Sequence, residues 1–175
     1  MRSGRILARP ARPGVRSKSM RSTLLALAIA LLPAAAAGEP GRLTVTGGLG
    51  AGGELGLEEG DAGVVEMEAA VGWEFQPSRV RPELALAVGF QPDGHLALRP
   101  GIRWSLPGLP IQLRAAVDLA NSRGDLHWRW LLIGAAAEIR LTDAFGLFAA
   151  LDSGIPLSTG AGVPVLARAG GAFRF

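Results

Sequence analysis

The sequence predicts an all-β fold, an eight-stranded antiparallel up-and-down transmembrane β-barrel. Segment after segment alternates apolar residues with small or charged ones, which is the period of two expected of strands rather than helices. The last segment, Val163–Phe175, keeps this alternation to the end of the chain and finishes on Phe. A leader of the kind that directs export precedes these segments. Strands that alternate between lipid-facing and interior-facing side chains are typical of membrane-spanning barrels.

The first element is a secretory signal peptide over residues 1–37. Its short apolar run, Thr23–Leu32, is followed by Pro33 and an A-x-A cleavage site at Ala35–Ala37, so we expect cleavage before Gly38. The run is shorter than the roughly 20 residues that a spanning helix needs. Met20 is a possible alternative start. The remaining residues, 38–175, are expected to form one outer-membrane β-barrel domain.

Charge and cysteine content narrow the function classes. The leader holds seven of the 18 basic residues. The part of the chain after Ala37 therefore contains eleven Arg and all 15 acidic residues, which gives it a net charge of −4. The basic isoelectric point of the whole chain is therefore no sign of a nucleic-acid partner. The chain has no Cys, which excludes disulfides and a lipid-anchored amino terminus.

Eight segments carry the strand pattern. We expect strands at Arg42–Gly52, Val64–Phe75, Arg81–Gln91, His95–Leu106, Pro110–Ala120, Leu126–Leu141, Phe145–Leu157 and Val163–Phe175. The second is the clearest, because Val65, Met67, Ala69, Val71, Trp73 and Phe75 alternate with Glu66, Glu68, Ala70, Gly72 and Glu74. The sixth changes phase near Leu131–Leu132, which indicates either a β-bulge there or a different register for this strand.

The connections fall into two sets, as an up-and-down barrel requires. If both ends of the barrel chain lie in the periplasm, the inner turns are 76–80, 107–109 and 142–144, all short. The outer connections are then 53–63, 92–94, 121–125 and 158–162, two of which are longer and glycine-rich. Aromatic residues are expected in two interfacial bands. One band holds Trp73, Phe75, Trp104, Phe145, Phe173 and Phe175, and the other holds Phe90, Trp128 and Trp130 facing lipid.

The closing segment resembles the last strand of bacterial outer-membrane β-barrels. Its outer face carries apolar residues up to Phe173 and Phe175, and its inner face carries Arg168 and Arg174. Across residues 38–175 the pattern resembles the OmpA/OmpX-type class of eight-stranded barrels. The resemblance implies location in the bacterial outer membrane, contact with its lipids and lipopolysaccharide, and recognition of Phe173 and Phe175 by the outer-membrane assembly machinery. It implies no particular external ligand.

The interior of the predicted barrel is charged. Eight strands enclose a space just wide enough for side chains, so we expect a closed, ion-paired core and no open channel. The inward acids are Glu66, Glu68, Glu74, Glu83, Asp118, Glu138 and Asp152. The inward bases are Arg81, Arg99, Arg103, Arg114, Arg140, Arg168 and Arg174. The alternative is a narrow pore with a gated ion path through these charges.

The first outer loop clusters carboxylates that could bind Ca²⁺ or Mg²⁺, namely Glu54, Glu58, Glu59 and Asp61. Their spacing lacks the D-x-D-x-D-G pattern, so we expect a solvated acidic loop with no metal and no cofactor. The tripeptide Arg123-Gly124-Asp125 matches adhesive ligands, but its surroundings are ordinary turn chemistry.

The nearest approach to a catalytic set is Ser122, Asp125 and His127 beside the outer rim. Some small outer-membrane barrels are lipid A hydrolases, and a Ser–His pair can activate a hydroxyl nucleophile. Here Ser122 is expected in the turn and His127 inside the barrel, and no G-x-S-x-G motif is present. We therefore expect a non-enzymatic protein with a structural or surface-interaction role. An outer-leaflet lipid A hydrolase and a narrow pore remain the alternatives.

Overall fold

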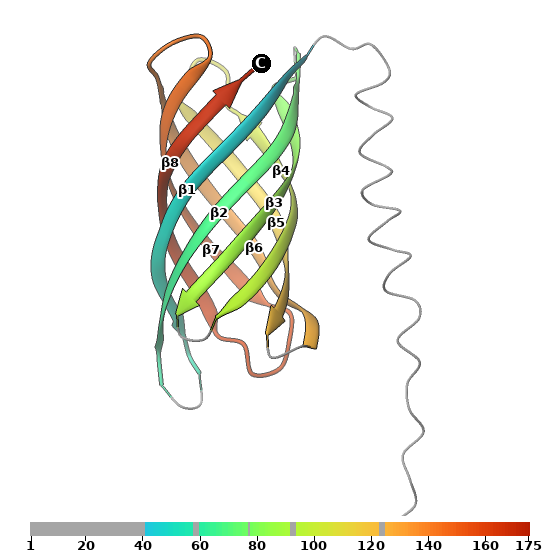
Figure 1. Cartoon of the computed structure of the whole chain (residues 1–175), viewed down its shortest axis with the longest axis vertical. Helices are drawn as coiled ribbons and strands as arrows, with labels where there is room; N and C mark the ends of the chain where they lie inside the picture. The colour runs from blue at the N-terminus through green and yellow to red at the C-terminus, as the bar shows by residue number, and fades with distance from the viewer. Residues whose placement is uncertain (1–40, 58–59, 77, 92–93, 123–124) are drawn as a thin grey trace, which may run out of the picture. The chain divides into compact units, whose positions relative to one another are not determined.

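Eight antiparallel strands close into one barrel in the order in which they follow along the chain (Figure 1). The computed structural model describes residues 41–175 apart from 58–59, 77, 92–93 and 123–124. The predicted signal peptide and Glu58, Glu59, Arg123 and Gly124 therefore lie outside the described residues. The strands are β1 (Gly41–Leu55), β2 (Ala62–Phe75), β3 (Val80–Gln91), β4 (His95–Ser105), β5 (Ile111–Ser122), β6 (Asp125–Arg140), β7 (Phe145–Pro156) and β8 (Val163–Arg174).

All eight predicted strands are present, which confirms the predicted fold class. Two of the outer connections are shorter than predicted. Strand β1 continues to Leu55 and β2 starts at Ala62, so Glu54 is a strand residue and not part of the loop. Strand β5 likewise continues to Ser122, which pairs in register with Asp125 of β6. The prediction that Ser122 lies in the turn is therefore wrong.

The barrel has a turn end and a loop end. The turn end, at the top in Figure 1, carries Gly41, Phe175 and the connections β2–β3, β4–β5 and β6–β7. The loop end carries the β1–β2, β3–β4, β5–β6 and β7–β8 connections. Closure joins β1 to β8 over twelve register pairs from Leu55↔Val163 to Thr44↔Arg174. A closed sheet has no edge strand whose backbone groups would go unpaired in lipid.

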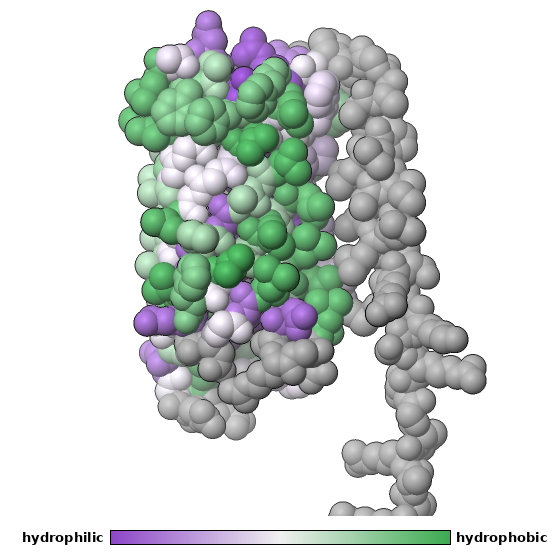
Figure 2. All heavy atoms as spheres, viewed as in Figure 1, coloured by the Kyte–Doolittle hydropathy of each residue, from purple (hydrophilic) through white to green (hydrophobic). Residues whose placement is uncertain are grey.

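The two faces of the sheet have opposite chemistry. On the outer face Leu49, Leu86, Ile139 and Leu151 are exposed, and Figure 2 shows such apolar residues as a belt between polar ends. Most inward positions on the same strands hold charged or small residues that are buried. Among the described residues, no helix is long and apolar enough to cross a membrane.

A β-bulge in β6 reverses the direction of one predicted side chain. Asp118 pairs with Trp130 and the next residue, Leu119, pairs with Trp128, which leaves Arg129 as an extra residue. The bulge thus lies two residues before the predicted site at Leu131–Leu132. From Trp130 onward the even-numbered side chains point into the barrel, and Trp130 is 0% exposed. The prediction that Trp130 faces lipid is therefore wrong, because the extra residue shifts the alternation by one.

Candidate functional site

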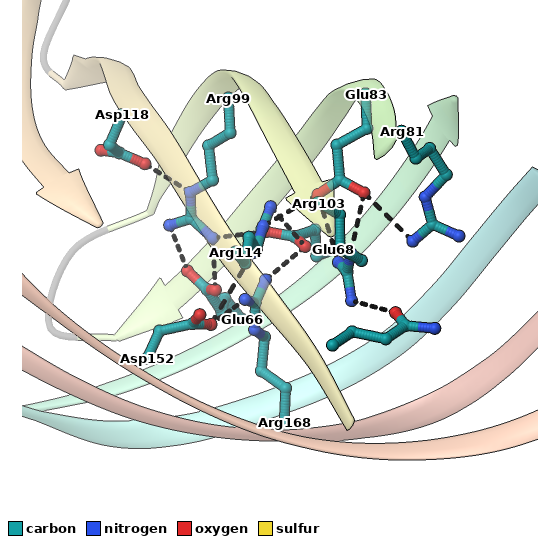
Figure 3. Close-up of polar contacts among 11 residues, drawn as sticks. Glu66, Glu68, Arg81, Glu83, Arg99, Arg103, Arg114, Asp118, Asp152 and Arg168 are labelled. Carbon is teal, nitrogen blue, oxygen red and sulfur yellow. Dashed lines mark hydrogen bonds and ion pairs between the residues drawn. The ribbon is translucent and has the colours of Figure 1, made fainter. Parts of the chain in front are cut away.

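The middle of the barrel is filled by a connected set of ion pairs that we call the charge network (Figure 3). Its carboxylates are Glu66, Glu68, Glu83, Asp118 and Asp152, and its guanidinium groups are Arg81, Arg99, Arg103, Arg114 and Arg168. Five negative charges thus meet five positive charges. Equal numbers matter because an uncompensated charge in a water-poor interior costs several kcal/mol.

Arg99 on β4 is a fully enclosed member of the network, with a side chain that is 0% exposed. It binds both oxygens of Glu66, and the Nη2–Oε2 distance is 2.7 Å. It also donates from Nη1 to Oε2 of Glu68 at 2.9 Å and from Nε to Asp118. One guanidinium therefore holds three carboxylates from strands β2 and β5. The fork of an Arg side chain suits this bidentate geometry, which Lys cannot reproduce.

Glu83 on β3 is the second centre of the network. Its Oε1 accepts from Nε of Arg114 at 2.9 Å, and its Oε2 accepts from Nε of Arg103 at 3.0 Å. Nη2 of Arg81 lies 3.3 Å from the same Oε2. On the opposite wall, Arg168 pairs with Glu68 and with Asp152 of β7. The network therefore crosses the barrel and ties six of its strands together, in addition to their backbone hydrogen bonds.

Toward the turn end the polar chain continues through Gln112. Its Nε2 donates to Oε2 of Glu138 at 2.6 Å, and Glu138 also binds Arg174 of the closing strand. Arg140 departs from the prediction of a buried interior charge. It is exposed and lines the mouth of the barrel, because it is the last residue of β6 and the sheet ends there.

A cavity of about 510 Å³ lies at this end of the barrel, and we call it the turn-end cavity. Arg42, Arg79 and Arg140 line it, and all three are exposed. Glu74 and Glu138 line it as well, but they are only 4% and 8% exposed. The cavity thus has basic groups that water reaches and acidic groups that are buried.

The loop end is closed by a contact that the sequence analysis missed. Glu54, predicted to be a loop carboxylate able to bind metal, is 2% exposed and points into the barrel. It pairs with the bulge residue Arg129 and accepts a hydrogen bond from the backbone N–H of Gly162 at 2.7 Å. The guanidinium of Arg129 lies 3.9 Å from the ring centre of Trp130, whose Nε1 donates to the carbonyl oxygen of Gly162 at 3.0 Å.

This arrangement fastens the β7–β8 connection over the barrel mouth. Below it, apolar side chains fill the interior on the loop-end side. These are Val64, Trp130, Leu132 and Leu166, each at most 1% exposed. The prediction of an ion-paired core did not include this apolar layer. The alternation of β8 already placed Leu166 on the inward face, and that signal could have revealed it.

Among the predicted catalytic residues, the structure describes the side chain of His127 but only the backbone of Ser122 and Asp125. His127 lines a pocket of about 280 Å³ at the loop end together with Glu54, Arg129 and Ser158. This pocket lies at the barrel mouth, so His127 is directed inward and not toward lipid. Ser122 and Asp125 are joined by strand pairing.

Two of the predicted metal ligands, Glu54 and Asp61, lie among the described residues, and each is engaged with another partner. Glu54 is engaged inside the barrel, whereas Asp61 accepts a hydrogen bond from the backbone N–H of Gly56 at 3.0 Å. Among the described residues there is no group of three or more His, Asp or Glu side chains placed to hold a metal ion.

The two terminal aromatic residues lie on the outer face of the turn end. Phe173 is 50% exposed, and its ring centre is 4.8 Å from that of Phe145 on the neighbouring strand. Phe175 is 75% exposed, and its backbone N–H donates to the carbonyl of Leu43 at 2.9 Å. Both rings are therefore accessible to an external partner while the backbone beside them completes the barrel.

Solved structures share this architecture at low sequence identity. Neisserial surface protein A is 12% identical, with 78% of this chain and 100% of that chain covered and a TM-score of 0.55. The N-terminal β-barrel domain of Pseudomonas aeruginosa OprF is 18% identical over 78% of this chain and 100% of that chain, with a TM-score of 0.52. Ail of Yersinia pestis, solved with the heparin analogue sucrose octasulfate, is 16% identical over 77% and 99% of the two chains, with a TM-score of 0.50.

No family model and no curated protein matches the sequence. The likeness to these structures concerns the fold, and it confirms the predicted class. The chain has the fold of these small eight-stranded β-barrels.

Proposed function

We propose that this chain, which has the fold of the small eight-stranded outer-membrane barrels, is an integral protein of the bacterial outer membrane with a structural or surface-interaction role. The observation that carries this proposal is the reversal of chemistry between its faces. Large apolar residues such as Leu86, Ile133 and Leu151 are 46%, 56% and 58% exposed on the outside, while Arg99 and Glu66 are fully buried inside. An apolar belt around a closed sheet is stable in lipid and would be an aggregation hazard in water.

The charge network supports a structural role for the interior rather than conduction. Each of its guanidinium groups contacts at least one carboxylate, and Arg99 contacts three. An ion that passed through would have to separate buried pairs, each of which is expensive to break. The apolar layer around Trp130 and the Glu54–Arg129 contact close the path again at the loop end.

The outer connections are the candidates for contact with other molecules. Ail, a barrel of the same fold, was solved in complex with the heparin analogue sucrose octasulfate. In this chain the first outer connection carries Glu58, Glu59 and Asp61, so its charge would repel such a polyanion. We therefore propose that the surface partner is cationic or uncharged.

An outer-leaflet lipid A hydrolase is the less favoured alternative. Such an enzyme would need its nucleophile and base where the acyl chains of lipid A can reach them. The position of His127 in the wall of the loop-end pocket, next to Glu54 and Arg129, favours a polar contact inside the mouth over that role. Mass spectrometry of lipid A from cells with and without the gene decides between the two. An acyl change that His127→Ala abolishes would establish the enzyme.

Cell fractionation with gel migration tests the main proposal. We expect the protein in the outer-membrane fraction, and we expect its unheated form to migrate faster than its boiled form because the closed barrel resists detergent. An epitope inserted at Gly60, in the β1–β2 connection, should be accessible to antibody on intact cells. Recovery of the protein in the soluble fraction with no heat shift would overturn the proposal.

A further inference from the structure

The turn-end cavity has the size and the polar groups of a small-molecule site, and the proposed function does not use it. Its volume of about 510 Å³ falls in the usual range of ligand pockets. The cavity lies at the end opposite the outer loops. Whatever occupies it would approach from the periplasmic side if the barrel is oriented as its class implies.

The buried wall of the cavity offers a carboxylate oxygen that is not yet used. Glu74 is 4% exposed, and its Oε2 is buried without a hydrogen-bond partner among the described residues. Glu138 in the same wall is already occupied, because it accepts from Gln112 and pairs with Arg174. A buried acceptor without a hydrogen-bond partner destabilises the protein, and more so when it is charged. Because Glu74 lines the cavity, a cationic group that entered it would meet the negative charge of this carboxylate.

The rim of the cavity carries the opposite charge. Arg42, Arg79 and Arg140 line it and are exposed. Arg79 has φ = 57°, a left-handed conformation that is uncommon for residues other than glycine. Two hydrogen bonds hold it there: its N–H donates to the carbonyl of Phe75 at 2.9 Å, and its carbonyl accepts from Ser105 at 3.1 Å. Guanidinium groups bind phosphate and carboxylate through paired N–H donors.

We propose that the turn-end cavity binds a small zwitterion. Its ammonium group would pair with Glu74 in the wall, and its phosphate or carboxylate would be held by the guanidinium groups of the rim. Phosphoethanolamine has this chemistry, since an ammonium and a phosphate are separated by two carbons. The same group occurs free in solution and as the headgroup of phosphatidylethanolamine.

Calorimetric titration of the refolded full chain in micelles tests the site. Phosphoethanolamine is the probe, and ethanolamine and inorganic phosphate serve as its two halves. Because both ends of the zwitterion are held, we expect it to bind about tenfold or more tightly than either half, each tenfold being worth about 1.4 kcal/mol. Equal and weak binding of all three probes would overturn the proposal.

Three variants locate the binding. Glu74→Gln keeps the shape and removes the charge, and it should reduce the zwitterion's affinity to that of phosphate alone. Arg140→Gln, at the exposed rim, removes one of the three guanidinium groups and should reduce it toward that of ethanolamine. The control is Asp143→Asn, an exposed carboxylate of the same end that does not line the cavity, and it should bind as the unaltered protein does. If Glu74→Gln does not refold, Arg140→Gln decides, and undiminished binding by it would refute the site.

Lipid nanodiscs distinguish a free ligand from a lipid headgroup as the occupant of the cavity. Phosphatidylcholine has no N–H to donate to Glu74, so in such discs the cavity should remain open to free phosphoethanolamine. If the lipid headgroup is the occupant, discs of phosphatidylethanolamine should abolish that binding. If the free compound is the occupant, binding should persist in both discs. Loss of binding in both discs would contradict the proposal. None of these results depends on which partner the outer loops contact.

Discussion

Gly48 and Gly170 pair across the seam where β1 closes on β8, and neither has room for a Cβ atom. A Cβ on Gly170 would lie 2.0 Å from the carbonyl oxygen of Gly47, and one on Gly48 would lie 2.7 Å from that of Ala169. Both obstacles are backbone atoms, which cannot rotate away. The closure of the barrel therefore depends on the absence of side chains at this pair.

Replacing Gly170 with Ala should weaken the closure. Overpacking of this kind costs about 1–3 kcal/mol, and occasionally more. The matched control is Gly47→Ala on the outer face of the same seam, where a Cβ would meet no atom within 4 Å. Urea unfolding in micelles, followed by tryptophan fluorescence, should show a lower midpoint for Gly170→Ala and an unchanged or slightly higher one for Gly47→Ala. Equal midpoints would show that the seam tolerates the side chain.

Removing the cation at the centre of the charge network should destabilise the barrel strongly. Arg99→Gln leaves Glu66, Glu68 and Asp118 without the guanidinium that they share. Breaking a buried pair from one side costs about 3–5 kcal/mol. Arg140→Gln, which alters an exposed residue, should change the free energy of unfolding by no more than about 0.5 kcal/mol. The same urea titration compares them, and similar stability for the two variants would refute a structural role for the network.

Most of the fold could be predicted from the sequence, because alternation of side chains follows directly from strand geometry. The errors lie where a residue interrupts that geometry. The extra residue Arg129 turns Trp130 inward, and a bulge leaves no local signal beyond a change of phase. Glu54 was assigned to an acidic loop because its neighbours are acidic. Its burial depends on Arg129 and Gly162, which are 75 and 108 residues away in sequence. The cavity around Glu74 likewise depends on distant strands.

The Glu54–Arg129 pair should hold the β7–β8 connection in place. Either Glu54→Gln or Arg129→Gln should make that connection more sensitive to a broad-specificity protease added to the refolded protein. The double variant should be little worse than the worse single one, because contacting residues are coupled by about 0.5–3 kcal/mol. Asp61→Asn, a carboxylate of another outer connection, is the control. Strictly additive effects would show that the two side chains act independently.

The terminal residue Phe175 should matter more for assembly in cells than for stability. Burying a Phe side chain is worth about 1.5–3 kcal/mol, which does not abolish a barrel by itself. If Phe175 is an assembly signal, Phe175→Ala should reduce the membrane level strongly, while the purified protein still refolds in detergent. Phe90→Ala removes another exposed ring, far from the carboxyl end, and should leave the membrane level near normal. A normal level of Phe175→Ala in the membrane would show that Phe175 is not an assembly signal.

The reversal of chemistry between the two faces of the sheet is tested most directly by cysteine labelling, since the chain contains no Cys of its own. Consecutive positions of β3 are replaced one at a time, with Leu84, Leu86 and Val88 on the outer face and Ala85 and Ala87 buried inside. Outer membranes are then treated with an apolar maleimide or with a sulfonated one. We expect the apolar reagent to modify Leu84→Cys, Leu86→Cys and Val88→Cys, and the sulfonated reagent to modify none of these three. Ala85→Cys and Ala87→Cys should resist both reagents. Modification of the three outer positions by the sulfonated reagent, or labelling without a period of two, would contradict this expectation.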